Sequence, residues 1–155
     1  MLLILLIIIL TGLDQIIKYL LPKFVLLNES KEIIKNFFYI TNVNNYGAAW
    51  STFYNHRILL IIISLLAILI IYKTFIKSSK LTKLNSLLLG MLYSGILGNL
   101  LDRIFRGYVI DYLDFKIFGY DYPVFNLADI LIVLGIIGLL IKSFKEEKNG
   151  KVFSK

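Results

Sequence analysis

The sequence contains no cysteine and a single histidine, His56. The lack of cysteine excludes a disulfide bond, a thiolate metal site, a thiol nucleophile and a lipid anchor on the chain's own cysteine. His56 stands near the start of an apolar run with no serine or carboxylate motif beside it, and we expect it to lie at an interface. Any catalysis by this chain must therefore use oxygen and nitrogen groups.

Charged residues are also scarce. They make up 17% of the 155 residues, against 58% hydrophobic residues, and the mean hydropathy is +0.78. This composition is too apolar for a soluble domain and fits one small polytopic membrane domain. Four apolar runs are close to the roughly 17–25 residues that a spanning helix needs, although the second is short. We expect transmembrane helices at about residues 1–21, 57–74, 83–102 and 124–142.

The first apolar run has one alternative interpretation, a cleavable signal peptide. It lacks the basic segment and the Ala-x-Ala-like cleavage site of such peptides, and it carries Asp14 and Lys18. We therefore predict that the run is retained as a transmembrane helix.

Basic charge gathers in two segments. The connection after the second run holds four lysines and no acid, and the segment from Lys142 to the end of the basic tail at 143–155 has a net charge of +3. By the positive-inside rule both segments are cytoplasmic, so both termini are cytoplasmic and residues 22–57 and 102–123 lie outside. Nucleic acid is not an expected partner, because these lysines flank apolar spans and lack interleaved aromatic residues.

The connection between the first two runs is predicted to form a small extracytoplasmic β-element at about residues 24–55. Residues 37–43 are rich in β-branched and aromatic side chains, and Asn44, Asn45 and Gly47 are turn signals. The predicted fold class is thus a mainly α membrane protein, a four-helix transmembrane bundle with this β-element.

Two further sequence patterns concern the packing of helices and the depth of a turn in the membrane. Gly90, Ser94 and Gly98 recur at every fourth position of the third run, which indicates a face that another helix can approach closely. Residues 118–123 form an aromatic turn expected at the depth of the membrane interface.

Asp111 and Asp129 are the most informative residues, because each adjoins apolar sequence. An ionisable group at the mouth of a membrane span is expensive unless it has a function. Two close carboxylates at low dielectric cannot both ionise, so they share a proton. One carboxylate can then take a proton from water while the other polarises a carbonyl, which is the chemistry of aspartic proteolysis. Asp114 and Asp121 are expected to be more solvated.

Other polar residues have both structural and functional interpretations. Asp14 and Lys18 have the spacing of an ion pair within one helix, either purely structural or supporting a site. Asn99, Asp102 and Arg103 share a face if the third helix extends that far, either as a helix-end cap and ion pair or as contacts to a substrate or a carboxylate. Asn126 and Asp129 fit a helix N-terminus as well as a site.

Two other functions compete with proteolysis. Clustered aspartates also hold Mg²⁺, as in membrane phosphotransferases. A transporter or channel would need polar groups through the membrane depth, whereas the middle of the second and fourth runs is almost purely aliphatic. The polar residues gather at one face, which favours catalysis at the interface.

Five motifs, in this order across nearly the whole chain, resemble those of the signal peptidase II family, the membrane aspartyl proteases that process bacterial prolipoproteins. They are Asp14-Gln15-Ile16-Ile17-Lys18, Asn45-Tyr46-Gly47-Ala48-Ala49-Trp50, Gly98-Asn99-Leu100-Leu101-Asp102-Arg103, Gly107-Tyr108-Val109-Ile110-Asp111-Tyr112 and Phe125-Asn126-Leu127-Ala128-Asp129. Trp50 and Tyr112 stand where phenylalanine is more usual in the family, and neither departure removes a polar group.

The resemblance implies Asp111 and Asp129 as the catalytic dyad. It implies that further residues bind substrate or support the site: Asn45, Gly47, Asn99, Arg103, Asn126, Asp14, Lys18 and Asp102. It also implies cleavage before a diacylglyceryl-modified cysteine, no metal or other cofactor, sensitivity to globomycin, and a β-cradle formed by about residues 24–55. The expected location is the bacterial cell membrane, with membrane lipids and prolipoprotein as partners and the chain as a monomer.

Overall fold

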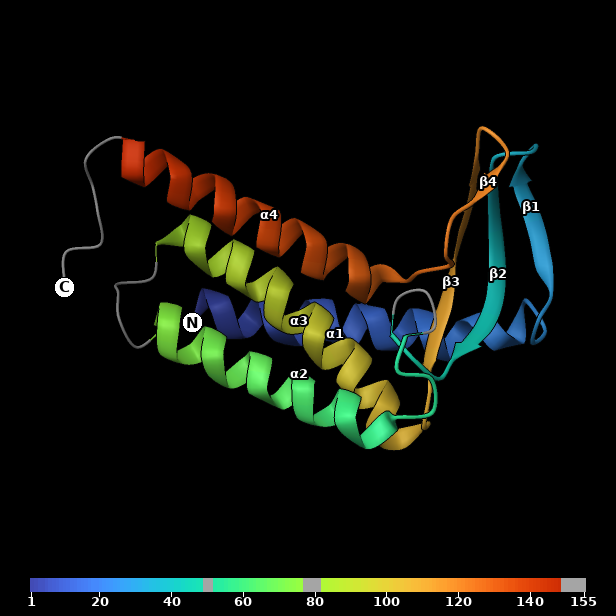
Figure 1. Ribbon diagram of the computed structural model, residues 1–155, viewed down its shortest axis with the longest axis horizontal. Helices are drawn as coiled ribbons and strands as arrows, with labels where there is room; N and C mark the ends of the chain where they lie inside the picture. The colour runs from blue at the N-terminus through green and yellow to red at the C-terminus, as the bar shows by residue number, and fades with distance from the viewer. Residues whose placement is uncertain (49–51, 77–81, 149–155) are drawn as a thin grey trace.

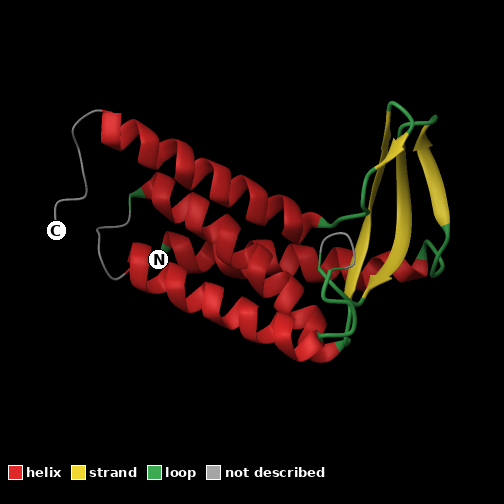
Figure 2. Ribbon diagram, viewed as in Figure 1, coloured by secondary structure: helices red, strands yellow, loops and turns green. Residues whose placement is uncertain are grey.

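The computed structural model describes residues 1–48, 52–76 and 82–148. It consists of a helical bundle with a small sheet at one end (Figure 2). The helices are α1 (Leu2–Leu20), α2 (Arg57–Ile71), α3 (Lys83–Phe105) and α4 (Leu127–Lys148), with a 3₁₀ turn at Leu21–Lys23 and a π-helical turn at Tyr72–Ile76. The strands are β1 (Ser30–Ile34), β2 (Phe38–Asn45), β3 (Val109–Ile117) and β4 (Tyr120–Asp121).

All four helices are long and apolar enough to cross a membrane, so the predicted fold class is confirmed. In α3, 56% of the most apolar window is buried inside the protein, against 11–17% in the other three helices. Thus α3 is the central helix, and the exposed apolar faces of α1, α2 and α4 suit contact with lipid. Helix α1 begins and α4 ends at the end of the bundle opposite the sheet (Figure 1).

The close approach of α1 to α3 depends on the stripe of small residues. A Cβ atom added at Gly90 would lie 2.9 Å from Cβ of Leu6, and one added at Gly98 would lie 2.5 Å from Oδ2 of Asp14. Both neighbours belong to α1, so the packing role predicted for the stripe is confirmed. Gly95, on another side of α3, lies against the Ala128 carbonyl of α4.

The antiparallel sheet has the order β1-β2-β3-β4, and it corrects the boundaries of the predicted β-element. Only β1 and β2 come from residues 24–55, because β3 and β4 come from the connection between α3 and α4. Pairing of β2 with β3 places Val43 opposite Asp111 and Asn45 opposite Val109. The sheet therefore brings two distant parts of the chain to the same end of the bundle.

Helix α4 begins at Leu127, later than the predicted position 124. Phe125 instead forms a β-bridge with Leu113, and this extended segment joins the sheet to the helix. At its other end α4 continues to Lys148, so the first part of the predicted tail is helical. Trp50 and the lysines at 77, 80, 151 and 155 lie outside the described residues.

Candidate active site

Two asparagines connect Asp111 of β3 with Asp129 of α4. Nδ2 of Asn126 donates a hydrogen bond to Oδ1 of Asp111 at 2.6 Å and lies 3.2 Å from Oδ1 of Asn99. Nδ2 of Asn99 in turn donates to Oδ1 of Asp129 at 2.8 Å. The structure thus brings together both carboxylates that stood out in the sequence, Asp111 held by the amide of Asn126 just before α4 and Asp129 by the amide of Asn99 in α3.

Asn126 and Asp129 also cap the N-terminus of α4. The Asp129 backbone N–H donates to Oδ1 of Asn126, and the Asn126 backbone N–H donates to Oδ2 of Asp129, both at 3.1 Å. This reciprocal arrangement is a capping box. The structural and functional interpretations of this pair are therefore compatible, because the cap itself fixes the Asp129 side chain.

Lys18 is completely buried and contacts Asn99, the residue that holds Asp129. Its Nζ is 2.9 Å from Oδ2 of Asp14, 2.9 Å from Oδ2 of Asp102 and 3.0 Å from Oδ1 of Asn99. Three acceptors match the three ammonium hydrogens. The contact also fixes the orientation of the Asn99 amide, because its oxygen faces Lys18 and its NH₂ group must then face Asp129.

The two acids paired with Lys18 each hold the backbone beside one member of the candidate pair. Oδ1 of Asp14 accepts from the Ala128 N–H at 3.2 Å, and Oδ2 of Asp102 accepts from the Ile110 N–H at 3.4 Å. Ala128 directly precedes Asp129, and Ile110 directly precedes Asp111. One buried ionic cluster therefore fixes the positions of both β3 and α4.

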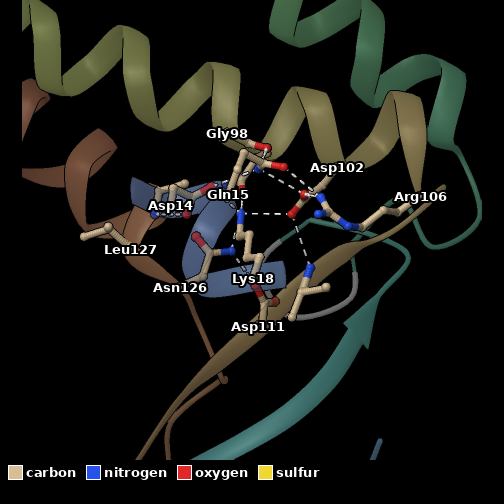
Figure 3. Close-up of polar contacts among 12 residues, drawn as sticks. Asp14, Gln15, Lys18, Gly98, Asp102, Arg106, Asp111, Asn126 and Leu127 are labelled. Carbon is tan, nitrogen blue, oxygen red and sulfur yellow. Dashed lines mark hydrogen bonds and ion pairs between the residues drawn. The ribbon is translucent and has the colours of Figure 1, made fainter. Parts of the chain in front are cut away.

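Sequence reasoning assigned no role to two members of this cluster, Gln15 and Arg106 (Figure 3). Nε2 of Gln15 donates to the Gly98 carbonyl and to Oδ1 of Asp102, both at 3.1 Å. Arg106 donates to Oε1 of Gln15 at 2.8 Å and forms an ion pair with Asp102. The i,i+4 spacing of Asp102 and Arg106 was the available signal for the second residue.

Asn45, Gly47 and Arg103 form the side of the site next to β2. Asn45 donates to Oδ2 of Asp111 at 2.8 Å and accepts from the Gly47 N–H at 2.9 Å. Arg103 donates to the Gly47 carbonyl at 3.0 Å and to the Asn99 carbonyl at 3.4 Å. In this structure Arg103 thus positions backbone rather than forming a bidentate contact with a carboxylate.

The candidate site opens into a cavity of about 650 Å³ between β2, β3, α2, α3 and α4. Its polar end is formed by Asn45, Asn99, Arg103, Asp111 and Asp129. The rest of the lining includes apolar side chains of the spanning helices: Leu60, Ile63, Ala67, Ile96, Ile132 and Val133. This separation of polar and apolar lining residues suits a ligand that has a peptide part and a hydrocarbon part.

Burial raises the pKa of Asp111 from its ordinary value of 3.8 to about 7. Loss of solvation is the largest cause, and the nearby charge of Asp129 raises the pKa further, against the amide donors of Asn45 and Asn126. The surroundings of Asp111 therefore favour its protonated form up to about neutral pH.

The other acids do not join this pair. Asp114 accepts a hydrogen bond from the Thr41 hydroxyl at 2.8 Å, and Asp121 is exposed beside Lys116. Over residues 1–48, 52–76 and 82–148, no group of three His, Asp or Glu side chains is arranged to hold a metal ion. The expectation of metal-free chemistry itself stays a prediction for experiment.

Gly98→Ala is expected to destabilise the protein by about 1–3 kcal/mol, as overpacking of a close interface does. The new methyl group would lie 2.5 Å from Oδ2 of Asp14, which Lys18 holds in place. Thermal unfolding in detergent measures the effect. Gly12→Ala is the matched control, because apart from the adjoining residues and backbone of its own helix nothing lies within 4 Å of its added Cβ, and alanine favours a helix. Equal stability of the two variants would contradict the role of Gly98.

Comparison with known proteins identifies the family of the chain. Residues 6–145 match the family model described as signal peptidase (SPase) II. The chain is 35% identical to the lipoprotein signal peptidases of Staphylococcus aureus strains JH9 and Newman, over 89% of this chain and 85% of each relative. A bacterial membrane enzyme solved by the in meso method at 2.3 Å has a TM-score of 0.87 and 32% identity, with 99% of this chain and 93% of that chain covered. A second such enzyme, at 1.9 Å, has a TM-score of 0.80 and 33% identity, with 90% of each chain covered. The chain therefore belongs to the signal peptidase II family.

Proposed function

We propose that this membrane peptidase removes signal peptides from diacylglyceryl-modified bacterial prolipoproteins by cutting before the lipidated cysteine. The observation that carries the proposal is the pairing of two differently buried carboxylates at the polar end of a cavity that continues between membrane-spanning helices. The peptide lies at the polar end beside β2 and β3. The acyl chains lie against the apolar lining from α2, α3 and α4.

The proposed reaction is attack of water on the scissile carbonyl. The proton shared by the pair resides preferentially on Asp111, because that carboxyl is the more buried of the two. Asp129 takes a proton from the attacking water, and Asp111 donates its proton to the carbonyl oxygen. As the tetrahedral intermediate collapses, one of its hydroxyl groups returns a proton to Asp111, the C–N bond breaks, and Asp129 gives its proton to the leaving amine. Asn45, Asn99 and Asn126 keep the two carboxylates aligned.

The same proposal includes the orientation in the membrane, the oligomeric state, the absence of a metal and the inhibition expected. The sheet and the candidate site lie on the extracytoplasmic side of the bacterial cell membrane, and both termini are cytoplasmic. The enzyme acts as a monomer without a metal. The cyclic peptide globomycin is expected to inhibit it by competing for the same cavity.

The test uses purified enzyme with two forms of one prolipoprotein, diacylglyceryl-modified and unmodified. We expect the modified form to be cut once, with a product that begins at the lipidated cysteine by mass spectrometry. The unmodified form should be cut at least about 100-fold more slowly, because buried acyl chains contribute about 0.8 kcal/mol per CH₂ group. Equal cleavage of the two forms, or cleavage elsewhere, would overturn the assignment of substrate.

The pH dependence of activity should follow Asp111. With its pKa at about 7, the pair loses its shared proton above neutral pH, and kcat/KM is expected to fall about tenfold per pH unit there. The measurement is kcat/KM from pH 5 to 9. A profile that stays flat to pH 9 would contradict the shared proton.

Stability should change with pH for the same reason. Between pH 3.8 and about 7 the folded protein retains a proton on Asp111 that the unfolded chain releases. The free energy of unfolding therefore falls as pH rises through this window, by up to about 4 kcal/mol. Asp111→Asn should lack this part of the slope, and an unchanged slope in that variant would assign it to other groups.

A further inference from the structure

The tip of the β3–β4 hairpin exposes aromatic side chains that the fold itself does not use. Phe118 is 104% exposed, and Tyr120 and Tyr122 are 55% and 48% exposed. Tyr120 and Tyr122 contact each other edge to face, with ring centroids 5.1 Å apart. The Phe118 ring buries essentially no area within the protein, so packing inside the fold does not explain an aromatic residue there.

The backbone conformation at the tip makes phenylalanine an unusual residue at position 118. Phe118 and Gly119 connect β3 to β4 in two residues, and both have positive φ angles, +51° and +78°. Such a turn normally begins with Asn, Asp or Gly, because other side chains clash in the left-handed conformation. Phenylalanine thus costs conformational energy at a position where it gains no packing. Phenylalanine at such a position indicates an interaction outside the fold.

The position of the β3–β4 hairpin indicates that its partner is the membrane. The strands run across the helix axes, and the tip reaches out on the side of the molecule where α4 lies (Figure 1). The face of α4 that includes Leu134, Ile137 and Leu140 is about half exposed and belongs to a membrane-spanning helix. The tip therefore extends over the lipid beside α4, where tyrosine and other aromatic rings prefer the headgroup region.

The charges at the tip indicate which lipids it accepts. Lys116 and Asp121 lie opposite each other on β3 and β4 and form an ion pair at 3.5 Å. The hairpin thus offers little net charge to an anionic headgroup. Its contact with the membrane should depend on aromatic burial and only weakly on the fraction of anionic lipid.

We propose that the β3–β4 tip is an interfacial anchor that inserts Phe118, with Tyr120 and Tyr122 beside it, into the outer headgroup region of the membrane that the bundle spans. The anchor fixes the height of the sheet above the bilayer. Since β3 carries Asp111 at its other end, the anchor also fixes the depth of the candidate site. The proposal rests on the membrane spans and on the orientation given above, and it does not depend on the proposed reaction.

Depth-dependent fluorescence quenching tests the anchor. Trp50 is the only tryptophan, so Phe118→Trp in a Trp50→Phe background gives one reporter at the tip. The protein is placed in phosphatidylcholine bilayers with bromine either near the headgroup or near the chain end. We expect at least twofold quenching by the lipid brominated near the headgroup, weaker quenching by the other lipid, and the same pattern with 20% anionic lipid.

Two further single-tryptophan variants serve as a depth control and as an alternative reporter at the tip. Leu134→Trp in the same background lies in the spanning part of α4 and should be quenched more strongly by the lipid brominated near the chain end. Tyr120→Trp reports on the hairpin if the Phe118 variant does not fold. Quenching of the tip reporter by aqueous iodide, with none by either brominated lipid, would overturn the proposal. Shielding from both lipid and iodide, with a dimer detected by crosslinking, would also overturn it by assigning the tip to a second copy.

Discussion

Asp129→Asn is expected to lower kcat at least about 10³-fold while the protein stays folded. Asparagine keeps the size of the side chain and can still accept from Asn99, but it cannot take a proton from water. A loss of this size corresponds to about 4 kcal/mol of transition-state stabilisation. Asp111→Asn should have a comparable effect, because the proposed mechanism needs a proton carrier at both positions. The measurement is single-turnover cleavage of the lipidated substrate.

The matched control for both variants is Asp114→Asn. Asp114 follows Asp111 on β3, but it hydrogen-bonds to Thr41 and does not line the cavity. Asparagine can still accept that hydrogen bond, so activity should stay within about threefold of wild type. Substantial residual cleavage by Asp129→Asn, at wild-type thermal stability, would remove Asp129 from the proposed catalytic pair.

Lys18→Met is expected to destabilise the protein by about 3–5 kcal/mol, the usual cost of leaving a buried charge without its partner. The variant keeps most of the side-chain volume but leaves Asp14 and Asp102 facing each other without the ammonium group that lies 2.9 Å from both. Arg106 still pairs with Asp102, so the larger part of the cost falls on Asp14. Chemical or thermal unfolding in detergent measures the loss.

A double variant distinguishes the effect of an unpaired charge from the effect of altered packing. In Lys18→Met combined with Asp14→Asn, one unpaired carboxylate is gone, and we expect the double variant to be more stable than Lys18→Met alone. Activity should remain low in both, because Asn99 no longer has the contact that turns its amide toward Asp129. Wild-type stability of Lys18→Met would show that the buried cluster does not support the fold.

The sequence predicted the four spanning helices because a membrane span is a local property of composition and length. It also singled out Asp111 and Asp129, because carboxylates adjoining apolar runs are costly wherever they lie. The Asp14 and Lys18 pair followed from helical spacing alone. These predictions needed no knowledge of which helix packs on which.

The remaining features depend on contacts between distant segments. Lys18 also binds Asp102 and Asn99, which are more than 80 positions away, and no periodicity in either helix predicts that meeting. The sheet was only partly predicted, because β3 pairs with β2 from another connection and β4 pairs only with β3. The later start of α4 has a similar cause, since Phe125 bonds to Leu113 of β3 before the helix begins.

The most direct test of the central claim is cleavage of a diacylglyceryl-modified prolipoprotein by the purified wild-type enzyme with and without EDTA. We predict cleavage before the lipidated cysteine at the same rate in both conditions, because two carboxylates and water suffice for the reaction. Loss of cleavage with EDTA, restored by added Mg²⁺, would show that cleavage depends on a metal ion and would contradict the metal-free carboxylate pair. Absence of cleavage by folded enzyme in either condition would contradict the proposed activity itself.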